Sequence, residues 1–176
     1  MARIRVQEGE LGEAPVDAVV STALPDLTPA DATAAALRRT AGPELEEACR
    51  SLGPARPGDV VVTPAGELAA RYVLHAVLET EGPLDEETLR VTVRSSLAAA
   101  RSRGLRSLAF PALGGGARAT GMQRRAEILL EEVRAPGVSD ALEEICFVIE
   151  GEPSYRVFEQ VHDAERIRAG LRKLAR

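Results

Sequence analysis

The chain has 176 residues, of which 45% are hydrophobic and 28% are charged, and this composition predicts a single domain over residues 1–176. Its formal net charge of −5 argues against nucleic acid as a partner, because binding to a phosphate backbone needs a basic surface. The two cysteines and two histidines have no metal-ligand spacing, so we expect neither a metal ion nor another cofactor.

The N-terminal residues run directly into an alternating strand pattern. No apolar segment there has the length of a signal peptide or a membrane span. We therefore expect a cytoplasmic protein with no membrane partner. The sequence leaves its oligomeric state open.

Strands rich in Val and Ile alternate with helices along the chain. In the first half the predicted elements are strands at 4–6 and 16–20, helices at 34–39 and 44–52, and strands at 58–64 and 71–78. In the second half they are a helix from Asp85 to about Arg103, a strand at 105–110, a helix at 122–133, a strand at 144–149 and a final helix marked by Tyr155, Phe158 and Val161. His162 and Asp163 are interpreted as the boundary of that helix, with Asp163 capping a further turn. This alternation predicts a three-layer α/β/α sandwich around a central mixed, largely parallel sheet.

Three consecutive glycines, Gly114 to Gly116, follow the strand at 105–110 and precede a helix. Glycines allow the backbone to approach a ligand closely, and N–H groups near a helix start can hold a phosphate. A flexible turn without a ligand is the alternative interpretation. Ligands of open α/β sheets bind beyond the carboxyl ends of the strands, where this run is expected.

Two segments carry the most specific signals. Residues 63–66, TPAG, lead to His75 in a pattern similar to the "TPGYNLPAKYVIH" segment of macro domains, and residues 109–112, AFPA, are similar to that family's "AFPAIS". The likeness extends from about Val6 to Val161. The chain thus resembles the macro domain family, whose members bind ADP-ribose and related nucleotides, and the resemblance implies the same fold.

The resemblance also implies a ligand site. Glu10 occupies the position of an Asp that hydrogen-bonds the adenine amino group, and the glycine run matches the "STG" turn over the diphosphate. Arg118 stands where many members carry an aromatic residue beside the distal ribose, and Ile149 lies near the segment that covers adenine. The expected ligand-binding residues are Glu10, Ser21, Thr22, Leu113, Gly114, Gly115, Gly116, Ala117, Arg118 and Ile149.

The first loop departs from the family pattern. Residues 21–24, STAL, stand against the family's "NAAN", so both asparagines are absent. Three alanines stand where the family has phosphate-loop glycines: Ala30, Ala32 and Ala35. Alanine at a positive φ angle carries a conformational cost of about 1–2 kcal/mol. We therefore predict that the loop has changed shape, with a helix extending from Pro29 or Asp31.

Ala34 occupies the position of an Asp that acts in hydrolytic members, and Asp31 is the one acid nearby. Asp31 is a weak catalytic candidate, and helix capping is the preferred interpretation. We expect a binding module for ADP-ribose or a related phosphorylated ligand, with altered or weakened affinity and with an ADP-ribose-like molecule or an ADP-ribosylated protein as partner. Two alternatives stay open: a hydrolase of ADP-ribosyl esters or of ADP-ribose phosphate with a rearranged site, and a scaffold without a ligand.

Other polar residues receive structural interpretations. His75 is expected in the core, and Cys49 and Cys146 are expected to be buried. The pairs Arg38-Arg39 and Arg124-Arg125 can form basic rims of a cleft, but solvated helix faces are the preferred interpretation.

Overall fold

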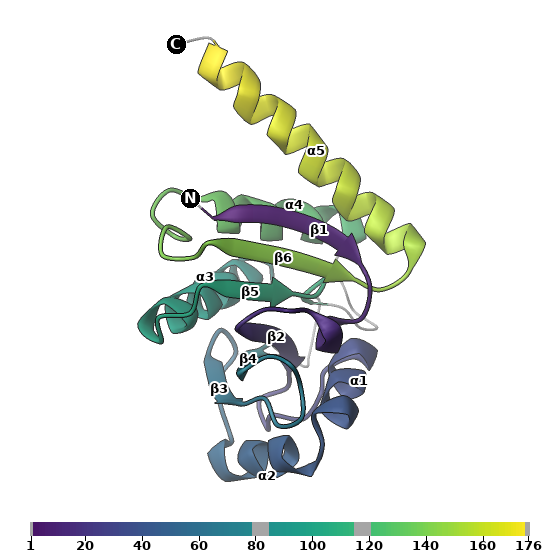
Figure 1. Cartoon of the computed structure of the whole chain (residues 1–176), viewed down its shortest axis with the longest axis vertical. Helices are drawn as coiled ribbons and strands as arrows, with labels where there is room; N and C mark the ends of the chain where they lie inside the picture. The colour runs from purple at the N-terminus through teal and green to yellow at the C-terminus, as the bar shows by residue number, and fades with distance from the viewer. Residues whose placement is uncertain (1, 79–84, 115–120, 175–176) are drawn as a thin grey trace.

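The computed structural model describes residues 2–78, 85–114 and 121–174. Six strands form one sheet in the order β1-β6-β5-β2-β4-β3 (Figure 1). Their bounds are β1 (Arg3–Glu8), β2 (Ala18–Ala23), β3 (Val60–Pro64), β4 (Tyr72–Val77), β5 (Ser107–Phe110) and β6 (Glu144–Ile149). All neighbouring strands pair in parallel except β3, which runs antiparallel to β4 at one edge. The predicted mixed, largely parallel sheet is confirmed.

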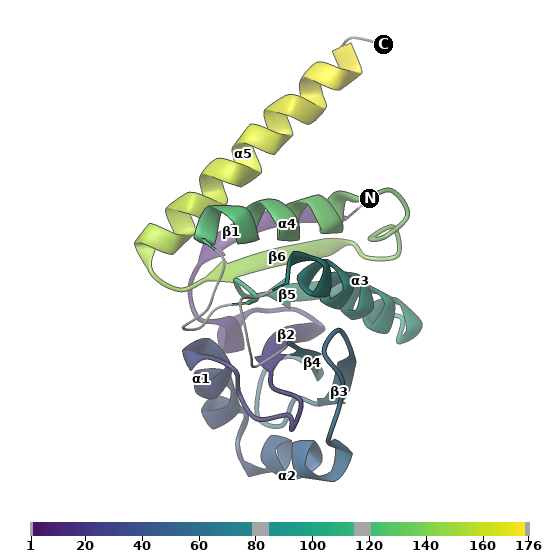
Figure 2. The same ribbon diagram turned by 180° about the vertical axis from the view of Figure 1, so that it is seen from behind.

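Helices cover both faces of this sheet (Figures 1 and 2). The short helix η1 (Leu11–Glu13), α1 (Ala32–Ala41) and α2 (Pro43–Leu52) pack on one face. On the other face lie α3 (Glu86–Ser102) and α4 (Met122–Arg134), with the start of α5 (Glu152–Leu174). Each face has its own cluster of buried apolar side chains, so the predicted three layers are confirmed.

Short-range signals set several helix ends. The Asp85 carboxylate accepts a hydrogen bond from the Thr88 N–H at 2.9 Å and caps α3. This bond gives an acceptor to one of the first N–H groups of the helix, which have none within the helix itself. Pro43 stands in the first turn of α2, where the missing N–H costs nothing. Gly104, at φ +63°, follows the end of α3 in the left-handed conformation that glycine adopts without strain.

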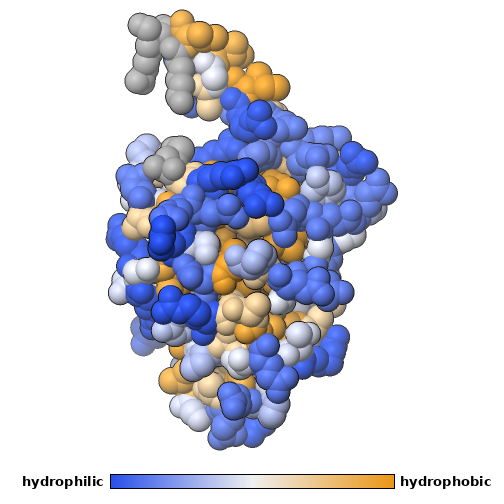
Figure 3. Space-filling view, in the orientation of Figure 1, coloured by the Kyte–Doolittle hydropathy of each residue, from blue (hydrophilic) through white to orange (hydrophobic). Residues whose placement is uncertain are grey.

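The last helix corrects one prediction. His162 and Asp163 lie inside α5, which runs without interruption from Glu152 to Leu174, so neither marks a boundary. Asp163 instead pairs with Arg166 one turn later, at 3.5 Å, and such a pair stabilises a continuous helix. The C-terminal part of α5 projects past the sheet (Figure 1), and hydrophobic side chains lie on this projecting end (Figure 3). The large exposed hydrophobic residues of this part of the helix are Ile167, Leu171 and Leu174.

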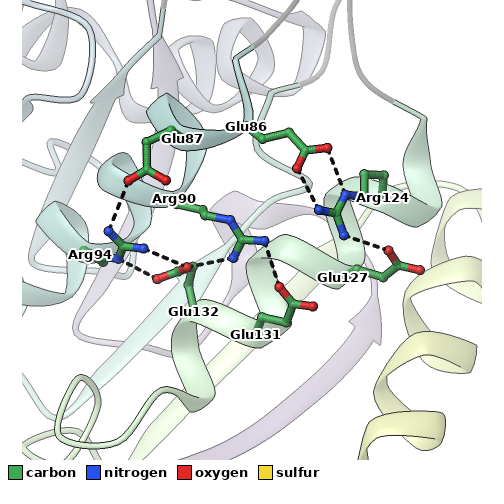
Figure 4. A network of polar contacts seen from close by, with 8 residues as sticks. All are labelled: Glu86, Glu87, Arg90, Arg94, Arg124, Glu127, Glu131 and Glu132. Atoms are coloured by element: carbon green, nitrogen blue, oxygen red, sulfur yellow. Dashed lines mark hydrogen bonds and ion pairs between the residues drawn. The ribbon is translucent and has the colours of Figure 1, made fainter.

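A network of ion pairs joins α3 to α4 (Figure 4). The Glu132 carboxylate, whose side chain is 7% exposed, accepts hydrogen bonds from Arg90 at 2.8 Å and from Arg94 at 2.7 Å. Burial alone would raise the pKa of Glu132, but the two arginines outweigh it and hold the pKa below its usual value. The buried charge therefore stays ionised at neutral pH.

Among the helices that the structure describes, none combines the length and hydropathy that a membrane crossing needs.

Candidate functional site

A cleft of about 360 Å³ lies at the carboxyl ends of the parallel strands. Its walls are residues 31–33 at the start of α1, residues 111–112 after β5 and residues 148–150 at the end of β6, with Ser154 at the start of α5. Met122 and Arg125, from the first turn of α4, complete the lining. The first loop and the segment that leads into the glycine run thus face each other across one cleft.

The wall formed by α1 explains how the chain accommodates its alanines. A bridge between Ala23 and Pro29 closes the loop that follows β2, and Leu27 is its residue with positive φ, +63°. Helix α1 then begins at Ala32, and the Asp31 carboxylate accepts a hydrogen bond from the Ala34 N–H at 2.8 Å. The predicted helix from Asp31, and its capping role, are confirmed. The alanines incur no left-handed strain, because positive φ among the described non-glycine residues is confined to Leu27.

Arg125 is the one arginine that is buried among the described residues, at 6% exposed. Its Nη1 donates to the Ala112 carbonyl oxygen at 3.0 Å, and its Nη2 lies 3.5 Å from the Met122 sulfur. Burial lowers the pKa of the guanidinium, partly offset by the charge of Asp31. A guanidinium remains cationic at neutral pH even so, so the cleft has a buried positive charge in its wall.

The preferred interpretation of the arginine pairs as solvated helix faces is wrong for Arg125 and for Arg38. The Arg38 side chain is 12% exposed; it donates to the Leu27 carbonyl oxygen and pairs with Glu46 at 3.1 Å. Arg124 is solvated and pairs with Glu86. Helical spacing is the signal that could have identified Arg125, because Leu129 and Glu132, four and seven residues later, are also buried.

The second loop is described only in part. Leu113 is fully buried, and Gly114 has φ +76°, a conformation that favours glycine. Four further residues predicted to bind ligand lie outside the described residues: Gly115, Gly116, Ala117 and Arg118. Their roles stay predictions.

One of the two predicted adenine-side residues lines the cleft, at the end of β6. This residue is Ile149. The Gly9 N–H donates to the Ile149 carbonyl oxygen at 3.2 Å, which places the next residue, the exposed Glu10, beside the same strand end. Glu10 itself does not line the cleft, and its contact with a ligand stays a prediction.

Ser21 and Thr22 are buried in β2. Thr22 Oγ1 has no hydrogen-bond partner within the described part of the chain, and the Thr22 carbonyl oxygen accepts from the Ala30 N–H at 3.2 Å. Thr22 therefore supports the first loop through its backbone, and a direct role of Ser21 or Thr22 in ligand binding stays a prediction.

A second polar cluster is buried between α2 and the sheet. His75, on β4, is 1% exposed, and its Nε2 lies 2.9 Å from Thr63 Oγ1 and 3.6 Å from Cys49 Sγ. Burial, with a smaller effect of the Arg38 charge, lowers the pKa of His75 to about 4. The expectation of a core imidazole is confirmed. In the described ranges, no group of three or more His, Cys, Asp or Glu side chains could hold a metal ion.

Comparison with known proteins gives a family match. The chain matches the family model described as "Macro domain" over residues 20–129. It is 32% identical over 161 residues to an uncharacterized protein of Mycobacterium tuberculosis, covering 90% of this chain but only 44% of that protein. It is 33% identical over 177 residues to an O-acetyl-ADP-ribose deacetylase of Citrobacter rodentium, covering 91% of this chain and 95% of the deacetylase.

Solved structures share the fold. A macrodomain of Trypanosoma brucei in complex with ADP superimposes with a TM-score of 0.82 at 30% identity, over 90% of this chain and 68% of that one. The same macrodomain in complex with ADP-ribose gives a TM-score of 0.78 at 29% identity, over 89% of this chain and 68% of that one.

Proposed function

Because the chain belongs to the macro domain family, we propose that it binds ADP-ribose, free or attached to a protein, in the cleft between the start of α1 and the segment after β5. The observation that carries the proposal is this cleft of about 360 Å³, which opens where the parallel strands end. The ADP and ADP-ribose complexes of the trypanosomal macrodomain support the ligand class.

The electrostatics of the cleft favour an anionic ligand. The first turns of α1, α4 and α5 all contribute lining residues, and helix N-termini carry a partial positive charge with N–H groups free to donate. The N-cap of α4 is Gly121, which has no side chain to occupy those groups. Two carboxylates, Asp31 and Glu150, also line the cleft, so the ligand is expected to hold its phosphates toward α4.

Affinity is expected to differ from that of members that retain the first-loop motif. An Asn side chain offers both an amide and a carbonyl to a ribose, whereas Ser21 and Thr22 are buried in β2. The distal ribose therefore loses polar contacts on this side. We expect the adenosine diphosphate part of the ligand to contribute most of the binding energy.

Calorimetric titration with ADP-ribose tests the proposal. Ala32 is exposed at the first position of α1 and lines the cleft, so Ala32→Trp should lower affinity by more than about tenfold by filling the space. Thr40→Trp is the matched control, because Thr40 is exposed on the same helix. Absence of binding by the wild-type protein at millimolar ADP-ribose, or equal affinity in both variants, would contradict the proposal.

A hydrolase is the second candidate, favoured by the likeness to deacetylases over 95% of their length. Asp31 lines the cleft and uses one carboxylate oxygen, Oδ1, to cap α1, so its other oxygen is available to orient a water molecule. Asp31→Asn keeps a capping side chain while removing the charge. If Asp31 acts in hydrolysis, this variant should release acetate from O-acetyl-ADP-ribose at a rate at least about 100-fold lower than that of the wild type. Unchanged turnover at unchanged stability would remove Asp31 from the mechanism.

A further inference from the structure

Arg125 differs from the other partly buried arginines of α1 and α4 in what it contacts. Arg38 pairs with Glu46 at 3.1 Å, and Arg134 pairs with Glu165 at 3.0 Å. Arg125 is more buried than either, yet no carboxylate of the described residues lies within ion-pair distance of it. Removing a charge from water is expensive unless an opposite charge compensates it, so this position calls for an anion.

Arg125 also uses only part of its hydrogen-bonding capacity within the described residues. A guanidinium has five N–H donors. One donates to the Ala112 carbonyl oxygen, another meets only the Met122 sulfur, and Nε has no partner among the described residues. Thioether sulfur is a weak acceptor, and a phosphate oxygen would replace it with a shorter, charge-assisted bond.

The surroundings of Arg125 point to the same chemistry. Arg125 lines the cleft together with the first turns of three helices, whose N–H groups favour negative charge. Of the two carboxylates in the lining, Asp31 accepts from the Ala34 N–H through Oδ1, and Glu150 accepts from Thr33 Oγ1 at 3.4 Å. The Asp31 charge only partly offsets the effect of burial on the pKa of Arg125.

We propose that Arg125 is an anion-binding residue of the cleft that donates hydrogen bonds to a phosphate oxygen of the ligand. The identity of the ligand as a nucleoside diphosphate derivative rests on the proposed function, but the phosphate contact does not need the nucleoside. Inorganic pyrophosphate is therefore a sufficient probe. Arg125 selects for the charged part of the ligand and contributes nothing to the recognition of an uncharged nucleoside.

The experiment compares the wild-type protein with Arg125→Met and Arg125→Lys by calorimetric titration of ADP-ribose, pyrophosphate and adenosine. Methionine preserves much of the length and volume of the side chain, and lysine preserves the charge. Arg124→Met is the matched control, because Arg124 is the adjacent residue and pairs with Glu86 at the surface. Thermal unfolding of each variant without ligand reports its stability.

We expect Arg125→Met to lower the affinity for ADP-ribose about 10- to 100-fold and to abolish pyrophosphate binding. Arg125→Lys should retain part of the pyrophosphate affinity, and Arg124→Met should change either affinity less than about twofold. The unfolding temperature of Arg125→Met should equal or exceed that of the wild type, because the variant removes a buried cation that forms no ion pair with any carboxylate of the described residues.

Three results overturn the inference. One is an Arg125→Met variant that binds ADP-ribose and pyrophosphate as the wild type does. Another is a parallel loss of stability and of affinity for all three ligands, adenosine included, which indicates a structural role through the Ala112 carbonyl. The third is a wild-type protein that binds neither anion. Pyrophosphate binding that depends on Arg125, without ADP-ribose binding, would refute the proposed function and support the inference.

Discussion

The Thr63 hydroxyl lies 2.9 Å from Nε2 of His75, across the antiparallel pair of β3 and β4. The His75 ring is almost wholly buried, and its Nδ1 has no hydrogen-bond partner among the described residues. Burial and the Arg38 charge both disfavour the imidazolium. The folded protein therefore holds a neutral histidine.

We expect the buried His75 side chain to lower the free energy of unfolding in acid. The pKa of His75 is about 4 in the folded protein, against an ordinary value of 6.5, so the unfolded chain takes up the proton first as the pH falls. The neutral His75 side chain makes its full contribution to the free energy of unfolding above pH 6.5. Below that, the free energy of unfolding falls by about 1.4 kcal/mol per pH unit as the pH falls toward 4. Urea unfolding of the wild type and of His75→Gln at pH 7.0, 6.0 and 5.0 measures the difference. Parallel pH profiles for the two proteins would contradict the prediction.

Glu132 is expected to be the most important acid of the α3–α4 network. Glu132→Gln leaves Arg90 and Arg94 without their shared carboxylate, and we expect a loss of about 2–4 kcal/mol in the free energy of unfolding. Glu131→Gln is the control, because the Glu131 side chain is 46% exposed and an exposed pair contributes about 0–1 kcal/mol.

The pH dependence of Glu132 has a definite sign. Its pKa in the folded protein lies below the ordinary value of 4.5, so its contribution is present above that value and is lost as the pH falls through the folded-state pKa. Denaturant unfolding at pH 7 and in acid should therefore show the two glutamine variants converging at low pH. Equal losses for both variants at pH 7 would show that burial of Glu132 adds nothing.

The two thiols are expected to be unreactive in the folded protein. Burial raises the pKa of Cys49, and it raises the pKa of Cys146 to about 11, while the thiolate is the reactive form. At pH 8 a disulfide reagent such as Ellman's should label neither thiol within minutes, and should label two per chain in denaturant. Rapid labelling of one thiol in the Cys49→Ala variant would assign the exposure to Cys146.

The sequence predicts the fold well because its strong signals are local. The Val- and Ile-rich strands, the first-turn proline at Pro43 and the caps at Asp31 and Asp85 all depend on a few neighbouring residues, and the structure confirms them. The first-loop prediction succeeds for the same reason, since four of the five residues at 32–36 are alanines and alanine has the highest intrinsic helix propensity.

The site is less predictable because it depends on contacts between distant segments. Arginine is usually exposed, so the sequence predicts a solvated face for Arg125. The structure instead places its guanidinium against the Ala112 carbonyl oxygen in the loop after β5. In the final helix, a local sequence signal is ambiguous. A His-Asp pair in a polar segment is compatible with a helix boundary, and only the i,i+3 pairing of Asp163 with Arg166 distinguishes a continuous helix.

The projecting end of α5 is expected to contribute little to stability. Residues 166–172 and Leu174 are exposed, whereas Phe158, earlier in the same helix, is fully buried with its ring centroid 5.8 Å from that of Phe147. Deletion of residues 167–176 should lower the unfolding temperature by less than about 3 °C, while Phe158→Ala should lower it on the order of 10 °C. Differential scanning calorimetry of the two proteins makes the comparison. A deletion as damaging as Phe158→Ala would mean that the apolar side chains of Ile167 and Leu171 are covered in solution, since side chains left in water have no burial energy to lose.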